Sequence, residues 1–166
     1  MKHILAVLLW AVPVLVFSMD SSKDESFFKN AAEGGMAEVN AGKFAQEKSA
    51  SQAVKDFGAM MVKDHSAANE KLNALAATQD VKLPSSPSLM QQASGKELQM
   101  KSGDSFDKSY IKNQIKAHEE TVALFQKEIA SGKDASAQQF ATATLPTIQM
   151  HLTKINQIAA AAGISK

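Results

Sequence analysis

Residues 60–69, MMVKDHSAAN, place a histidine where the surrounding periodicity requires an apolar residue. Around it, apolar and small residues recur at alternating steps of four and three, a spacing typical of the buried face of an amphipathic helix. This stripe consists of Val54, Gly58, Met61, His65, Ala68, Leu72 and Leu75. His65 is therefore either a core histidine satisfied by a hydrogen bond or one member of a site, and the other helices decide between these alternatives.

The rest of the chain repeats this pattern and has no alternating strand pattern, which predicts an all-α fold. Four long helices are expected at about residues 24–48, 51–77, 105–130 and 135–161. Each helix has one ionisable residue near the middle of its apolar line. In chain order, these residues are Glu38, His65, His118 and His151.

The connections predict how the helices are joined. Residues 78–88, TQDVKLPSSPS, concentrate proline, serine and aspartate and end the second helix. A short helix is expected within residues 89–101, interrupted near Gly95, so the whole segment can run the length of a bundle. Two helical hairpins joined by one long crossover are the plan of a ferritin-like four-helix bundle. Pro146 should kink or divide the last helix, because proline removes a backbone hydrogen bond and crowds the preceding turn.

The first residues, MKHILAVLLWAVPVLVFS, are typical of a secretory signal peptide. A short basic start precedes an apolar run that is too short for a comfortable membrane span, and Val16 and Ser18 occupy the small-residue positions that a signal peptidase favours. We therefore expect a signal peptide at residues 1–18 and a single bundle domain at residues 19–166. The expected location is periplasmic or secreted, without a stable transmembrane anchor after cleavage; a retained anchor is the alternative.

Composition excludes several classes of function. The absence of cysteine excludes disulfides and a lipid-anchored N-terminal cysteine. Without Lys2, 17 lysines face 17 acidic residues and there is no arginine, so nucleic acid is not an expected partner. No nucleophile constellation, glycine-rich phosphate loop or cofactor fingerprint occurs, which makes an enzyme the weakest interpretation.

The four polar residues on the apolar lines come to similar heights. Counting from the short turns, Glu38 and His65 differ by roughly 5 Å, and His118 and His151 by roughly 6 Å. Three imidazoles and a carboxylate suit one divalent transition metal, which could be zinc, iron, manganese or copper. The alternative is a metal-free polar cluster in which Glu38 holds a protonated histidine.

Several neighbours of these four residues have two interpretations. Asp64 and Glu119, beside two of the histidines, either orient an imidazole or lie on the side of the stripe, solvated or in an inter-helix salt bridge, and their adjacent positions favour the second role. Asp107 and Tyr110 are expected near a helix start, with the phenol between helices. Methionine thioethers bind copper(I), but helical methionines are more often core residues. The four methionines in question are Met36, Met60, Met61 and Met150.

The segments FFKNAAEGGMAEVNAGKFA, VKDFGAMMVKDHSAANEKL, FDKSYIKNQIKAHEETVALF and LPTIQMHL resemble an exported bacterial family of unknown function. That family is often labelled as membrane or outer-membrane protein and is grouped with the ferritin-like superfamily. The positions that match its pattern are Glu38, Asp64, His65, Phe106, Asp107, Tyr110, His118, Pro146 and His151. Ferritin-like di-iron proteins carry Glu-x-x-His on two helices. Here Val62, Ile115 and Ile148 stand three residues before the histidines, so a single metal is expected rather than a di-iron centre.

Two hypotheses follow. The first is an exported bundle that binds one transition-metal ion through Glu38, His65, His118 and His151, in metal handling or stress protection. The second is a non-enzymatic envelope protein that contacts a protein partner or a second copy of itself. The second requires an exposed apolar patch on the crossover. Its apolar residues are Leu83, Leu89, Met90, Leu98 and Met100.

Overall fold

The computed structural model describes residues 22–165, and all regular structure in this range is helical, which confirms the predicted all-α class. The helices are α1 (Ser22–Lys48), α2 (Gln52–Thr78), α3 (Leu89–Gln99), α4 (Gly103–Ser131) and α5 (Ala135–Ala161). None of these helices is long and apolar enough to cross a membrane. The predicted signal peptide at residues 1–18 lies outside the described residues.

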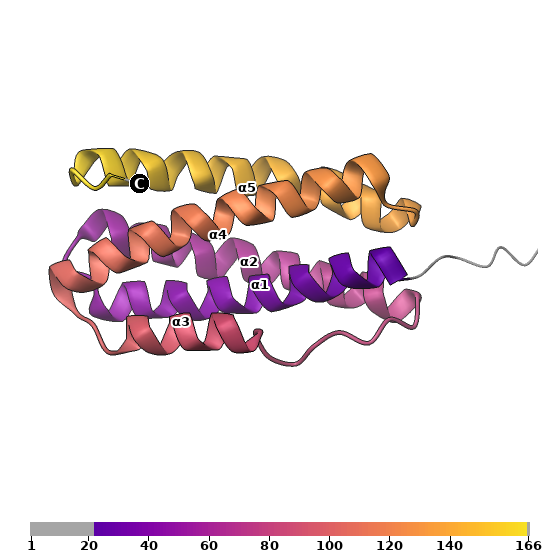
Figure 1. The fold of residues 1–166 in the computed structure, drawn as a ribbon, viewed down its shortest axis with the longest axis horizontal. Helices are drawn as coiled ribbons and strands as arrows, with labels where there is room; N and C mark the ends of the chain where they lie inside the picture. The colour runs from indigo at the N-terminus through magenta and orange to yellow at the C-terminus, as the bar shows by residue number, and fades with distance from the viewer. Residues whose placement is uncertain (1–21, 166) are drawn as a thin grey trace, which may run out of the picture.

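The four long helices form two hairpins, α1 with α2 and α4 with α5 (Figure 1). The segment that follows α2 returns along the molecule, with α3 against α1, so α4 starts at the same end as α2. Between the hairpins, α1 packs on α4 and α2 packs on α5. Each of these long pairs is therefore antiparallel.

Three local expectations need correction. The short helix α3 continues through Gly95, and a capping box between Ser88 and Gln91 fixes its N-terminus. The helix α4 starts at Gly103, two residues earlier than expected, where glycine supplies a positive φ of 56°. Pro146 does not divide α5, since its side chain is exposed and the helix continues on both sides of it.

The core consists of two apolar clusters, one toward each end of the bundle. One gathers around Phe57, Tyr110 and Ile155, and the other around Phe27 and Phe125. On each long helix, a buried polar residue separates the residues of one cluster from those of the other. These residues are Glu38, His65, His118 and His151, and all are buried. A polar layer therefore divides the core at mid-height.

The turn between α1 and α2 is held by a carboxylate from the other hairpin. Asp107 of α4 is buried, and the hydroxyl of Ser49 donates to its Oδ1. The backbone N–H of Ser51 donates to its Oδ2 at 3.0 Å. Ser51 in turn caps α2 through a bond from the N–H of Val54. Asp107 thus fixes the position of α4 against the start of α2.

The turn between α4 and α5 is held in the same manner from α1. The carboxylate of buried Asp24 accepts from the backbone N–H groups of Lys133, at 3.1 Å, and Asp134, at 2.7 Å. Asp134 caps α5 through the N–H of Ala137 at 2.7 Å. Each hairpin therefore supplies the buried aspartate that orders the turn of the other.

Glu128 lies beside this second aspartate and is buried. Burial, and after it the charges of the Asp24 and Asp134 carboxylates, raise the pKa of Glu128 to about 7. Its Oε1 has no hydrogen-bond partner. The three neighbouring carboxyl groups of Asp24, Glu128 and Asp134 are therefore most stable together when Glu128 carries a proton.

We expect Asp107→Ala to lower the free energy of unfolding by about 2–4 kcal/mol, because it removes the charged acceptor that the Ser49 hydroxyl and the Ser51 N–H share across the two hairpins. Urea unfolding monitored by circular dichroism measures this change. Asp104→Ala is the matched control, since Asp104 is exposed on the first turn of the same helix and should change stability by less than about 0.5 kcal/mol. Equal effects of the two substitutions would contradict the role given to Asp107.

We expect Glu128→Gln to stabilise the protein at alkaline but not at acidic pH. Because the folded pKa of about 7 exceeds the ordinary 4.5, the parent has its full stability below pH 4.5 and loses it as pH rises through 7. The amide stays neutral, so the variant should gain roughly 2–3 kcal/mol over the parent at pH 8 and almost nothing at pH 4.5. Urea unfolding at both pH values tests this, and a gain that does not depend on pH would contradict it.

Candidate metal centre

The three histidines of the polar layer form a compact triangle. His65 comes from α2, His118 from α4 and His151 from α5, and their ring centroids are 5.4 to 5.8 Å apart. One ring nitrogen of each lies within 4.8 Å of a ring nitrogen of the other two. The predicted convergence of the histidines is therefore present in the structure.

Hydrogen bonds determine which ring nitrogens carry protons. The Nδ1–H of His118 donates to the carbonyl of Gln114 at 2.9 Å, because a carbonyl can only accept. The Nε2–H of His151 donates to Asp64 Oδ2, also at 2.9 Å. The remaining nitrogens, His118 Nε2 and His151 Nδ1, are buried without a partner, as is His65 Nε2. Buried polar atoms are normally paired, so three such nitrogens in one place require a reason.

Two of the histidines, His65 and His151, are held in their neutral forms. Burial, and after it the neighbouring His118 and His151, lower the pKa of His65 to about 3. Burial also lowers the pKa of His151, although its bond to Asp64 acts in the opposite direction. Neutral imidazole has the lone pair that a metal requires. These two rings can therefore act as ligands at neutral pH without first losing a proton.

Phe57 of α2 closes one side of the triangle. Its ring centroid is 6.2 Å from that of His118 and 6.4 Å from that of His151, with the rings edge to face. Phe57 is 1% exposed and also packs against Tyr110. Solvent is therefore excluded from this side of the histidines.

Glu38 of α1 lies beside the triangle but not within it. It is buried, yet the group of close ligand atoms comprises only the histidines. Burial raises the pKa of Glu38, and the nearby His118 and Gln114 oppose this shift. Burial and the charge of Glu38 together raise the pKa of Tyr110. The expected four-residue cluster is therefore three imidazoles with a carboxylate at their side.

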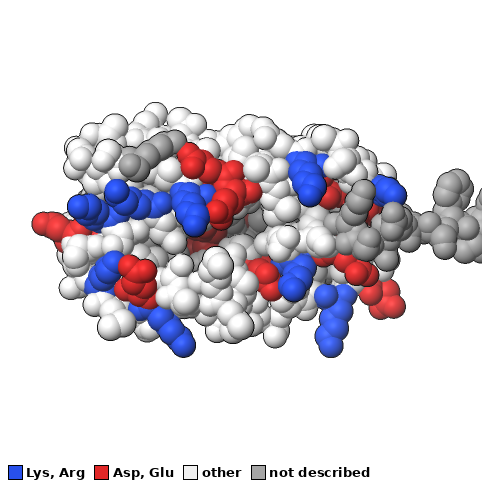
Figure 2. Space-filling view, viewed as in Figure 1, with Lys and Arg blue, Asp and Glu red and all other residues white. Residues whose placement is uncertain are grey.

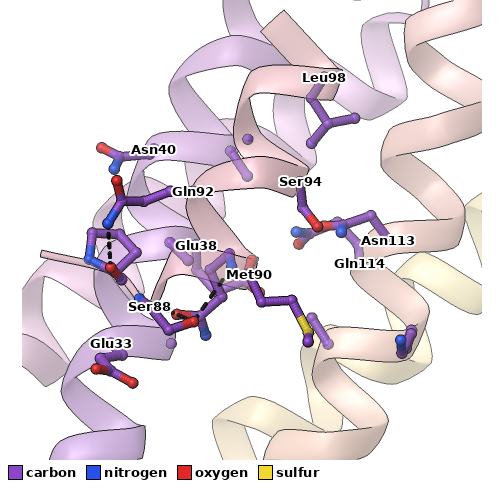
Figure 3. Close-up of a pocket in the computed structure, with 18 of the residues that line it drawn as sticks. Glu33, Glu38, Asn40, Ser88, Met90, Gln92, Ser94, Leu98, Asn113 and Gln114 are labelled. Carbon is purple, nitrogen blue, oxygen red and sulfur yellow. Dashed lines mark hydrogen bonds between the residues drawn. The ribbon is translucent and has the colours of Figure 1, made fainter.

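Two hollows reach this layer from outside. A groove of about 890 Å³ lies between α3, α1 and α4, with acidic side chains gathered near it on the surface (Figure 2). In Figure 3, Glu38 and Gln114 lie at its inner side, and Met90 extends from α3 toward α4. A second cavity of about 300 Å³ is lined by His65 and His151 and also by Glu38. Glu38 therefore borders both hollows.

Some site residues were not predicted or were given another role. Gln114 is fully buried one helical turn before His118, and its place on the inward line of α4 was a signal that could have been used. Asp64 does orient an imidazole, but that of His151 on α5 rather than that of its neighbour. Among the methionines, Met61 is a fully buried core residue, whereas Met150 is 46% exposed and lines the smaller cavity.

The apolar residues of the crossover divide into two groups. Leu98 is buried and Leu83 packs against the core. The other three are largely exposed: Leu89 (84%), Met90 (79%) and Met100 (89%). An exposed apolar patch on the crossover, which the hypothesis of an interaction protein requires, is therefore partly present.

Comparison with known proteins places the chain in context. A family profile described as a domain of unknown function, DUF4142, matches residues 18–158. None of the curated protein sequences matches the chain. A structure described as a secreted protein, DUF305, from Streptomyces coelicolor superposes with a TM-score of 0.73 at 10% identity, covering 87% of this chain and 96% of the other.

Two further solved structures share the fold. A conserved hypothetical protein from Mycobacterium tuberculosis has a TM-score of 0.69 at 16% identity, with 88% of this chain and 96% of the other covered. CopM in its Cu(I)-bound form has a TM-score of 0.68 at 13% identity, with 82% and 95% covered. At these identities the likeness shows the fold alone.

We expect His65→Leu to stabilise the metal-free protein by about 1–2 kcal/mol at pH 7, because it removes a buried nitrogen that has no partner. The folded pKa of His65 lies below the ordinary 6.5, so the parent loses stability as pH falls from 6.5 toward 3. The advantage of the variant should therefore grow by roughly 2 kcal/mol at pH 5. Unfolding in the presence of a chelator measures both values. A variant less stable than the parent at pH 7 would refute this account.

Proposed function

The chain belongs to the family described as a domain of unknown function, DUF4142, and we propose that it binds one transition-metal ion through His65, His118 and His151. The observation that carries this proposal is the set of three buried ring nitrogens, one from each histidine, that have no partner. In a core that serves stability alone, such atoms would have hydrogen-bond partners or their positions would hold apolar residues. A metal ion would instead bind all three nitrogens at once.

The surroundings of the histidines fit a metal ion. Metal-binding histidines usually donate their other ring N–H to a carboxylate or a backbone carbonyl, and Asp64 and the Gln114 carbonyl accept such bonds here. Tetrahedral coordination with metal–nitrogen bonds of about 2.0–2.1 Å requires nitrogens about 3.4 Å apart. The present spacing of up to 4.8 Å reaches this value through small rotations of the side chains. Glu38 supplies a nearby negative charge to offset that of the ion.

The donor set favours zinc or copper among the four metals considered. Imidazole nitrogen suits both ions, whereas manganese prefers oxygen ligands, and the Asp64 carboxylate is already engaged with His151. Copper(I) gains support from the Cu(I)-bound form of CopM, which shares the fold. Iron storage of the di-iron kind is disfavoured because the Glu-x-x-His pairs are lacking.

We place this site in a ferritin-like four-helix bundle that is exported through an N-terminal signal peptide. The two antiparallel hairpins and the long crossover support the bundle assignment. The description of the Streptomyces relative as secreted supports export. Within the periplasm or outside the cell, the protein would act in metal handling or stress protection without turnover of a substrate.

The second candidate is an envelope protein that binds a protein partner or a second copy through the crossover. The exposed side chains of Leu89, Met90 and Met100 favour it. The two candidates differ in what they require of the histidines, since only the first needs a metal. Metal analysis therefore separates them.

We expect the protein to bind one equivalent of zinc or copper(I), and His65→Ala or His118→Ala to weaken this binding by more than 100-fold. Asp64→Asn should weaken it by about 10- to 100-fold, because the His151 ring loses its carboxylate acceptor. Competition titration with a chromophoric chelator and elemental analysis measure both quantities. Asn73→Ala, an exposed change on α2, is the control.

The fold of each variant is checked by circular dichroism. If the parent binds no stoichiometric metal, or the histidine variants bind it as tightly as the parent, the metal proposal is wrong and the second candidate remains.

A further inference from the structure

The three imidazoles come from three of the four long helices, and the fourth, α1, contributes Glu38 beside them. Glu38 lines the same cavity as His65 and His151. It is not among the close ligand atoms. A metal held by His65, His118 and His151 would therefore have a fourth tetrahedral position beyond the three imidazoles.

A cavity of about 300 Å³ adjoins the histidines. Two of the ligands, His65 and His151, line it directly. Its volume is about ten times the share of one water molecule in the liquid, and it falls at the lower end of the range for small-molecule sites. The space therefore exceeds what a single metal-bound water needs.

The walls of this cavity select the kind of molecule that it can hold. Much of the lining is apolar, including Leu72, Phe125, Phe140 and Ile148. The rings of Phe125 and Phe140 lie 6.0 Å apart, the spacing of a contacting aromatic pair, and both offer apolar surface to the cavity. Its ionisable lining residues other than histidine are Glu38, Asp64 and Lys71, so carboxylates outnumber cations. An anion would face both desolvation and repulsion by these carboxylates.

We infer that the metal bound at this site keeps one coordination position open toward the cavity and that this position takes a small neutral aromatic molecule with one nitrogen donor. The inference rests on the proposed metal site and names its ligand class. The nitrogen coordinates the metal while the ring fills the apolar space between α2, α4 and α5.

The test uses the protein loaded with cobalt(II), whose visible absorption depends on its coordination. We expect 4-methylpyridine to change this spectrum in a saturable manner. The isomer 2,6-dimethylpyridine should not change it, because its methyl groups shield the nitrogen. Azide, a small anion, should need at least a tenfold higher concentration than 4-methylpyridine. Tighter binding of azide, or no response to 4-methylpyridine, would overturn the inference.

A cavity-filling variant tests the location. Ala68 of α2 lies one turn beyond His65 and lines the cavity. Ala68→Leu should keep the cobalt spectrum of the parent without added ligand but weaken the binding of 4-methylpyridine at least tenfold. Ala59→Leu, exposed on the same helix, should leave that binding unchanged. Unchanged binding in Ala68→Leu would place the ligand elsewhere and overturn the inference.

The outcomes separate the two proposals. Failure of cobalt(II) to bind before any probe is added contradicts the metal site itself. If cobalt(II) binds normally but 4-methylpyridine does not change its spectrum, the metal-site proposal stands and only the inference of an open coordination position is wrong.

Discussion

The relative position of the two hairpins depends on two buried aspartates, Asp24 and Asp107. Each carboxylate accepts hydrogen bonds from backbone N–H groups in the turn of the opposite hairpin. Each therefore fixes the height of one hairpin against the other. The histidine triad combines His65 of the first hairpin with His118 and His151 of the second. A shift of one hairpin by a single helical turn, about 5.4 Å, would separate them. The convergence of the site is therefore a consequence of how the turns are held.

The polar layer lowers the stability of the fold, and packing alone does not explain why it is present. Burial disfavours the charged forms of Glu38, His65 and His151, and several of their polar atoms lack partners. Apolar residues at these positions would join the two clusters into one continuous core. Residues that break a local rule of stability in this way are expected where a protein has a function to perform. The layer is thus better explained by a ligand than by the needs of folding.

The sequence was sufficient for the helices and for the heights of the polar residues, because both follow from helical periodicity and rise. It was not sufficient for the distant partners of three aspartates. Asp64 and His151 are 87 positions apart, Asp107 and Ser51 are 56 apart, and Asp24 and Asp134 are 110 apart. Such pairs depend on which hairpin faces meet, and periodicity leaves this open. The start of α4 at Gly103 and the continuous α3 were also missed, since both depend on local backbone conformation rather than on the apolar pattern.

The exchange of anchors between the hairpins has a consequence for assembly. Asp24 and Asp107 recognise the complementary half of the fold, and nothing in that recognition requires both halves to belong to one polypeptide. Residues 79–102 join the halves and include only the short α3. Two chains that traded hairpins across an extended linker could form every one of these bonds again, so the architecture is intrinsically compatible with a domain-swapped dimer.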